Sequence, residues 1–253
     1  MSFLKKWLGG KNNGETAKDG TTIYSYDEAE DDGYTAPAPM MYTEEIVEHF
    51  ERVFPGRNSS VFHEIISDIV HIDVNIMEPT EQEPFWILYT TGMSDLPMTL
   101  PESILEQLED SFDRAELIIF LPATWELNEQ AFKDDNNYWP VRLMKQLARF
   151  PHQYNTWLGY GHTIPNYQDY EPYADGTGLN GVVLYELNED LSVIPTKDGN
   201  KVHTYFLIPL YREEMEYKLE HGMEALMEKL FELGNDVLVL NPKRRNIAIG
   251  GSS

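Results

Sequence analysis

The chain has 253 residues, 42% hydrophobic and 12% aromatic, a composition typical of a folded protein with a sizeable core. It contains no cysteine, which excludes disulfides, thiolate zinc sites and cysteine nucleophiles. Its 43 acidic and 19 basic residues give a net charge of -24, which repels nucleic acid and anionic lipid. We therefore expect no nucleic-acid partner and no membrane association. The charge favours a basic protein partner, although solubility alone is an equal explanation.

Residues 1–40 differ from the rest and predict a flexible acidic, glycine-rich tail. The segment GGKNNGETAKDGTT is polar, and DEAEDD and TAPAP follow it. The opening FLKKWLGG lacks the apolar run of a signal peptide, and no later segment reaches the length of a membrane span, so we expect a cytoplasmic protein. A short amphipathic anchor is the alternative for these first residues, but eight residues are few for a stable helix. We predict one folded domain at residues 41–253, which holds 15 basic and 36 acidic residues, net -21.

Apolar spacing predicts helices and strands in mixed order within this domain. They are a helix at residues 43–54, strands at 71–79 and 84–92, a helix at 101–112, a strand at 115–122, a helix at 138–150, strands at 181–187 and 202–211, a long helix from 212 to about 231 and a strand at 236–242. This order predicts an α+β fold, a mixed β-sheet flanked by helices.

Single residues set the expected helix ends. Thr43 is the expected N-cap of the first helix, and Pro55 and Gly56 follow its end. Pro140 suits the first position of the helix at 138–150, and Pro151 should break or kink that helix.

No motif in the chain indicates a cofactor, a metal or catalysis. The glycines of GTGLNG, residues 176–181, match G-x-G-x-x-G, but they lack a strand before and a helix after them. The segment GMSDL is not a nucleophile elbow, and Ser94 and Asp95 suit a turn after a strand. The seven histidines show neither H-x-H nor H-E-x-x-H spacing. We therefore predict no catalytic residue, no cofactor-binding residue and no metal ligand; a metal site assembled across the fold, from residues distant in the sequence, is the open alternative.

Aromatic residues are dense between residues 154 and 173, and Tyr and Trp are enriched where a partner buries a surface. Core packing is the alternative, and we favour it for Trp157. The predicted partner-binding residues are Tyr154, Tyr160, His162, Tyr167, Tyr170 and Asp95. For His162, in WLGYGHTIPN, the pattern leaves open a structural role, a partner contact and acid–base or metal chemistry.

Four motifs occur in an order that resembles the suppressor of fused domain. They are WILYTTGMSDLPM, AELIIFLPATW, WPVRLMKQLARFPHQYNTWLGYGHTIPN, and FLIPLYREEM followed by GMEALMEKL. The resemblance covers about residues 42–245 and is to the compact bacterial form, since nothing remains for the extra C-terminal domain of the animal proteins.

The resemblance implies a binding protein, because the family is not known for catalysis. Animal members sequester Gli-type transcription factors by holding a short extended peptide, and bacterial relatives beside polymorphic toxin genes are inferred to be immunity proteins. Animal members carry an acidic residue before the histidine that matches His162, whereas this chain has Gly161, so the likeness extends to the scaffold and not to the animal peptide. The resemblance places His162 in a turn that leads into a strand, where its ring nitrogens would order a loop or the side chain would line a binding groove.

Three hypotheses for the function follow. The first is a non-catalytic, cytoplasmic binding module that sequesters or neutralises a protein partner, as an immunity protein against a basic polymorphic toxin would. The second is a scaffold or regulator that docks an extended peptide of a host protein through the tyrosine-rich loop. The third is an enzyme that uses His162 with a nearby carboxylate.

Overall fold

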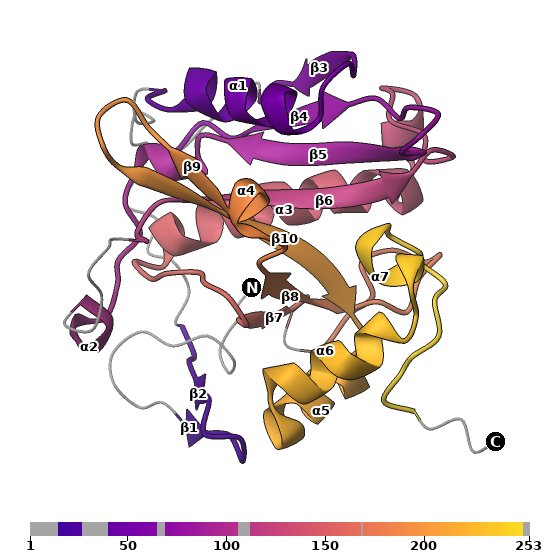
Figure 1. The fold of residues 1–253 in the computed structure, drawn as a ribbon. Coiled ribbons are helices and arrows are strands. Elements are labelled where there is room, and N and C mark those ends of the chain that lie inside the picture. Colours follow the sequence, from indigo (N-terminus) through magenta and orange to yellow (C-terminus); the bar gives the residue numbers. More distant parts are fainter. Residues whose placement is uncertain (1–14, 27–39, 65–68, 106–111, 168, 250–253) are drawn as a thin grey trace.

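One mixed β-sheet forms the centre of the protein (Figure 1). The computed structural model describes residues 15–26, 40–64, 69–105, 112–167 and 169–249. The strands of this sheet are β3 (Ser59–Phe62), β4 (Asp73–Met77), β5 (Phe85–Thr91), β6 (Ala115–Pro122), β7 (Thr163–Pro165), β8 (Gly181–Tyr185), β9 (Val193–Pro195) and β10 (Lys201–Leu210).

Their order in the sheet is β3-β4-β5-β6-β10-β8-β7, with β9 paired to the start of β10. Strand β10 is parallel to β6, and all other neighbours in the sheet are antiparallel. The predicted α+β fold with a mixed sheet is confirmed.

Helices cover both faces of the sheet. They are α1 (Thr43–Val53), α2 (Glu102–Leu105), α3 (Asp135–Gln153), α4 (Glu189–Ser192), α5 (Arg212–His221), α6 (Met223–Phe231) and α7 (Asn235–Leu238). Strand β6 shows the two-sided burial: Leu117 and Ile119 pack with α3 on one face, and Ile118 and Phe120 pack with α1 and α6 on the other. A strand buried on both faces has a continuous apolar run in its sequence, as this one does.

The first helix has the predicted position, but its N-terminus is held differently. Tyr42, not Thr43, is the residue at the N-cap, and it makes no side-chain capping bond. The carboxylate of Asp95, in a short 3₁₀ helix (Met93–Asp95), instead accepts the N–H groups of Met41 and Tyr42 at 2.8 and 3.4 Å. The cap is therefore supplied from a distant segment, which a local pattern could not reveal.

Helix α3 places Pro140 at a different helical position than expected and continues past Pro151. Asp134 caps it by accepting the N–H of Asn136 at 2.9 Å, so the helix starts at residue 135 and Pro140 lies inside it rather than at its first position. Pro151 does not break the helix, which continues to Gln153. A proline in the last turn removes only one helical hydrogen bond, and the helix ends two residues later anyway.

The C-terminal third differs from the prediction in two places. Gly222, at φ +91° and ψ 169°, divides the expected long helix into α5 and α6. The expected strand at 236–242 is instead the short helix α7 and a single parallel bridge between Val239 and Phe120. Of the helix expected at 101–112, residues 102–105 are helical and residues 106–111 lie outside the described part. None of the helices in the described ranges combines the length and apolar character needed to cross a bilayer.

Part of the expected tail packs onto the domain. Residues 15–26, here called the N-terminal strap, contain the antiparallel pair β1 (Glu15–Thr16) and β2 (Thr22–Ile23). The ring of Tyr26 is 5.4 Å from the rings of both Phe150 and Tyr154, and the Asp19 N–H donates to the Leu219 carbonyl at 3.3 Å. The strap therefore lies between α3 and α5. The other tail residues, 1–14 and 27–39, are outside the described part.

Candidate functional site

Strand β7 lies at one end of the sheet and pairs only with β8 among the described strands. The Leu184 N–H donates to the His162 carbonyl at 2.9 Å, and the Asn166 N–H donates to the Asn180 carbonyl at 2.8 Å. Because hydrogen-bonding residues alternate along an antiparallel pair, Thr163 turns its N–H and C=O away from β8. An outward N–H and C=O on an edge strand form a template for another extended chain.

Two cavities flank this edge. The first, about 220 Å³, lies between the strap, β7 and α5, and the second, about 230 Å³, lies between β7 and the C-terminal half of α3. Phe150 and Ile164 line both. Every second side chain of an extended peptide points to the same face, so two neighbouring cavities along a strand edge suit alternate side chains of a bound segment.

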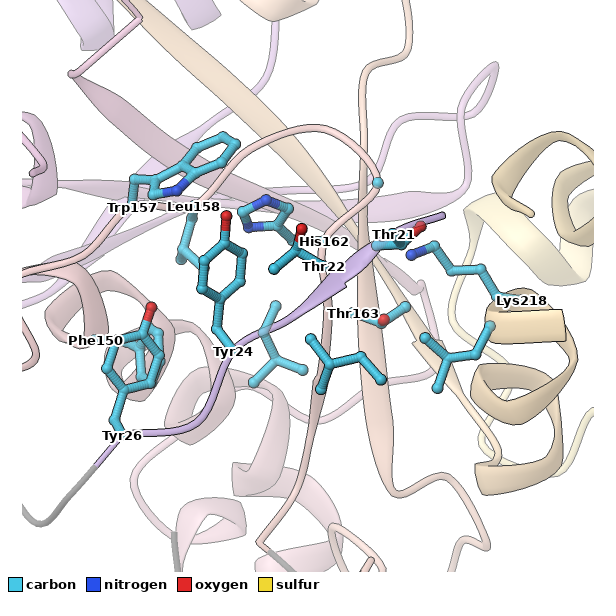
Figure 2. A pocket seen from close by; sticks show the side chains of 14 residues that line it. Thr21, Thr22, Tyr24, Tyr26, Phe150, Trp157, Leu158, His162, Thr163 and Lys218 are labelled. Carbon is cyan, nitrogen blue, oxygen red and sulfur yellow. The ribbon is translucent and has the colours of Figure 1, made fainter. Parts of the chain in front are cut away.

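His162 and Lys218 line the first cavity from opposite sides (Figure 2). Burial, with a smaller contribution from Lys218, lowers the pKa of His162 to about 4. Burial also lowers the pKa of Lys218, whose side chain reaches from α5 toward the strap. The imidazole stands edge-on to Trp157, with 4.2 Å between the ring centroids. His162 is therefore neutral at pH 7.

The loop role expected for the ring nitrogens of His162 does not form, since they bond to no described residue. Its backbone supplies the order instead: the His162 N–H donates to the Gly159 carbonyl at 3.1 Å, and its carbonyl accepts from Leu184. Gly161, at φ +78°, permits the turn that brings the imidazole to the cavity.

Tyr154 and Tyr167 line the second cavity. Tyr154 follows α3 and packs on Phe150, with 4.9 Å between the rings. Tyr167 is 45% exposed and has φ +59°, a conformation uncommon for a residue with a side chain. A tyrosine held at the rim of a cavity in this way presents both a ring and a hydroxyl to a ligand.

An exposed row of aromatic rings continues from the first cavity across β8 to α6. The rings of Tyr160 and Tyr185 are 5.8 Å apart, and those of Tyr185 and Phe231 are also 5.8 Å apart. Tyr160 is 51% exposed and Phe231 45%. Glu186 and Glu224 lie close enough to Tyr160 to raise its pKa, in addition to the larger effect of burial. The row therefore combines apolar area with negative charge.

Two predicted binding residues lie elsewhere. Tyr170 is buried in the core on the other face of the sheet, with the guanidinium of Arg212 4.6 Å from its ring centroid. Asp95 is 3% exposed and holds the start of α1. Of the predicted set, Tyr154, His162 and Tyr167 meet at the β7 edge, and Tyr160 lies beside it.

Neither the strap nor Lys218 is among the residues that the sequence predicts for a binding site. The stretch Thr22–Tyr26 is rich in β-branched and aromatic residues, a composition typical of a strand, but the polar residues before it conceal the signal. Lys218 lies on α5, a helix of mostly polar and charged residues, where nothing in the spacing distinguishes a buried lysine from a solvated one.

The β7 edge offers little to a metal ion or to a catalytic base. Among the described residues, the one group of three possible metal ligands is His63, His71 and Asp73, on the far side of the sheet order near β3. His162 has no carboxylate partner in the described part to orient its ring as a base.

Comparisons with known proteins identify similar sequences and folds. The family model described as suppressor of fused protein (SUFU) matches residues 68–245. Comparison with curated protein sequences gives no significant match. A suppressor of fused homologue from Neisseria gonorrhoeae has 15% identity and a TM-score of 0.59, covering 83% of this chain and 98% of that one.

Two further structures have the same fold. A chain of the Sufu–Fu complex has 17% identity and a TM-score of 0.58, covering 84% of this chain and 93% of that one. Drosophila Suppressor of Fused has 18% identity and a TM-score of 0.59, covering 83% of this chain but 52% of that one. The chain thus spans about half the length of the Drosophila protein.

Proposed function

The chain belongs to the suppressor of fused family, and from this premise we propose that it is a non-catalytic module that sequesters or neutralises a protein partner. The β7 edge carries the proposal: a strand edge with an outward N–H and C=O, flanked by two cavities and continued by exposed aromatic rings. Main-chain hydrogen bonds would hold an extended segment of the partner, and the cavities would select its side chains. The related structure solved as a Sufu–Fu complex supports a protein as partner.

Charge supports a basic partner. The net charge of residues 41–253 is -21, and Glu186 and Glu224 stand beside the exposed ring of Tyr160. An acidic surface attracts a cationic protein over distance and raises the association rate, an effect that salt screens. A basic polymorphic toxin, bound and neutralised in the cytoplasm, is the partner of this kind that we propose.

The test is affinity capture from lysate of the native host with three baits, washed at low and at high salt. The baits are the wild-type chain, a Tyr160→Ala/Tyr167→Ala variant and the control Val61→Ala. Val61 is also an exposed apolar residue on an edge strand, but on β3 at the opposite end of the sheet. A partner retained by wild type and Val61→Ala but lost from the tyrosine variant supports the β7 edge; equal recovery with all three baits excludes it.

A second variant tests the main-chain contribution. Thr163→Pro removes the outward N–H and leaves the bonds between β7 and β8, since Thr163 does not donate to β8. We expect capture to weaken while the melting temperature stays close to that of wild type. Unchanged capture by a folded Thr163→Pro variant would contradict peptide addition at this edge.

The toxin hypothesis has its own test. The captured partner is expressed alone in a susceptible host and then together with this chain. Growth arrest that co-expression relieves supports neutralisation, and release of the partner by high salt supports the electrostatic contribution. A partner that is harmless alone and stays bound at high salt would instead favour the second hypothesis, a scaffold that docks a host peptide.

A further inference from the structure

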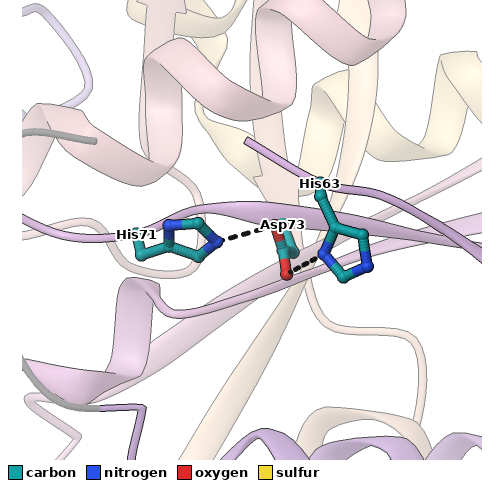
Figure 3. Close-up of side chains that lie close together, drawn as sticks. All are labelled: His63, His71 and Asp73. Carbon is teal, nitrogen blue, oxygen red and sulfur yellow. Dashed lines mark hydrogen bonds and ion pairs between the residues drawn. The ribbon is translucent and has the colours of Figure 1, made fainter. Parts of the chain in front are cut away.

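Three potential metal ligands converge at the start of β4 (Figure 3). His71 and Asp73 are two residues apart, so their side chains leave the same face of the chain. Because Phe62 pairs with Val74 in the antiparallel register of β3 and β4, His63 comes opposite Asp73 in the next position. The sheet therefore brings together residues that no sequence motif connects.

The distances are close to those of a metal coordination shell. His63 Nδ1 is 2.9 Å from Asp73 Oδ2, and His71 Nε2 is 3.0 Å from Asp73 Oδ1. The ligand atoms all lie within 4.8 Å of one another. Ligands in a tetrahedral zinc site lie about 3.3–3.5 Å apart, given Zn–N and Zn–O bonds of about 2.0–2.2 Å. The two histidine–carboxylate distances would have to lengthen by a few tenths of an ångström, and a pair of ligand atoms at the 4.8 Å limit would have to approach by about 1.3–1.5 Å.

The group is anchored on one side and adjustable on the other. The Asp73 side chain is 4% exposed, and the Glu64 N–H donates to its Oδ1 at 3.0 Å, which fixes the carboxylate from behind. The side chain of His63 is 71% exposed and can turn toward an ion without disturbing the core. Hydrogen bonds that orient a ligating carboxylate are the usual support of a metal site.

One cation lies near the group: the Lys145 ammonium is close enough to Asp73 for their charges to interact, so a metal ion would compete with it for the carboxylate. Glu64 is an ion-pair partner of Arg149 and accepts the Ile72 N–H at 3.2 Å, so it is not a fourth ligand. Three protein ligands of imidazole and carboxylate type leave one position open, as in the zinc sites that keep a water or an external ligand.

We propose that His63, His71 and Asp73 bind a divalent transition-metal ion, with Zn²⁺ as the probe. Imidazole nitrogen favours Zn²⁺, Co²⁺ and Ni²⁺ over Mg²⁺ and Ca²⁺, which prefer oxygen ligands. The ion would join the end of edge strand β3 to β4 and offer its open position at the surface. Such a site would be the metal site assembled across the fold that histidine spacing leaves open.

The test is titration of Zn²⁺ into the full chain, prepared free of metal and without a histidine tag, by isothermal calorimetry at pH 7.5. We expect one ion per chain, with affinity reduced at least tenfold in His63→Ala and in His71→Ala. The control is His221→Ala on α5, an exposed histidine whose Nδ1 donates only locally, to the Tyr217 carbonyl at 3.0 Å. The His221→Ala variant should bind Zn²⁺ with the affinity of the wild-type chain.

Cobalt provides an independent readout of the ligand set. Co²⁺ in the wild-type chain should give the visible absorption of a four-coordinate nitrogen and oxygen site, and excess Mg²⁺ should not displace it. The proposal is overturned by the absence of stoichiometric binding, by unchanged affinity in both His63→Ala and His71→Ala, or by displacement with Mg²⁺. Because His63 is exposed, its variant is expected to fold, and circular dichroism checks this.

Discussion

The guanidinium of Arg244 donates two hydrogen bonds of 2.6 Å to the carboxylate of Glu214, and both side chains are almost completely buried. Arg244 also donates to the Pro209 carbonyl at 2.8 Å. The carboxylate accepts further N–H groups from Tyr211 and Ile247, each at 3.0 Å. One ion pair thus joins the end of β10, the start of α5 and the C-terminal segment, and it fixes the helix that carries Lys218.

We expect Arg244→Met to lower the free energy of unfolding by about 3–5 kcal/mol, because it leaves a buried carboxylate without its cation. The double variant Arg244→Met/Glu214→Leu should lose considerably less, since it removes both charges. Urea denaturation followed by circular dichroism measures both values. A loss below about 1 kcal/mol in the single variant would show that the carboxylate finds water or another partner.

A buried carboxylate on β6 predicts a pH dependence. Glu116 is completely buried and accepts from the hydroxyls of Thr90 and Ser94 and from the N–H groups of Gly92 and Ser94. Burial, the largest effect, raises the pKa of Glu116 to about 7 from an ordinary value of 4.5. Between these values the folded protein binds a proton that the unfolded chain does not, so stability falls as pH rises.

The contribution of Glu116 to the free energy of unfolding is therefore complete below about pH 4.5 and lost as pH rises through about 7, a change of roughly 3 kcal/mol. Glu116→Gln removes the titration and keeps the acceptor oxygen. We expect the variant to gain stability relative to wild type between pH 5 and pH 8, measured by urea denaturation at each pH. A constant difference across this range would contradict the raised pKa.

The close approach of two chain segments makes Gly92 a specific test of packing. Gly92 has φ +107°, and a Cβ placed there would lie 1.8 Å from the His71 carbonyl oxygen. Gly199 has a similar φ of +88° but nothing within 4 Å. Gly199→Ala should therefore cost about 1 kcal/mol for backbone strain alone, and Gly92→Ala about 3 kcal/mol or more. Thermal unfolding compares the two, and equal losses would mean that the backbone at His71 moves freely.

The sequence predicts strand β6 residue by residue, because AELIIFLP is an apolar run bounded by polar residues. The sequence does not predict the start of α3 correctly. Pro140 suits the first position of a helix, but Asp134 caps the helix and starts it at residue 135. The sequence also fails at Gly222, since only the structure shows that this glycine adopts a positive φ and ends α5. Local patterns identify elements that are stabilised locally.

The candidate site was predicted in part for the same reason. The aromatic residues after α3 are visible in the sequence, so Tyr154, Tyr160, His162 and Tyr167 were named. The cavities depend on contacts across more than 100 residues, such as the hydrogen bond between the hydroxyls of Tyr26 and Thr156. The approach of His63 to Asp73 likewise needs the register of β3 on β4. No spacing within a single segment encodes these relationships.

The depressed pKa of His162 gives the last prediction. Its folded value of about 4 lies below the ordinary 6.5, chiefly because the ring is buried and secondarily because Lys218 is near. Between these values the unfolded chain binds a proton at His162 that the folded protein does not. The contribution of the neutral His162 to the free energy of unfolding is therefore complete above pH 6.5 and is lost as pH falls toward 4. In His162→Gln, the free energy of unfolding should fall by about 1–3 kcal/mol less than in wild type when the pH is lowered from 6.5 to 4.

Two-dimensional NMR of the imidazole checks the cause directly. The His162 ring signals should stay at their neutral positions down to about pH 5, and in Lys218→Met the pKa of His162 should rise modestly, because the nearby positive charge is removed while burial remains. A His162 that titrates near 6.5 in the wild-type chain would mean that water reaches the first cavity freely and that the strap does not cover it in solution. A neutral His162 between pH 6 and 8 also requires that capture of the partner through this cavity be insensitive to pH in that range.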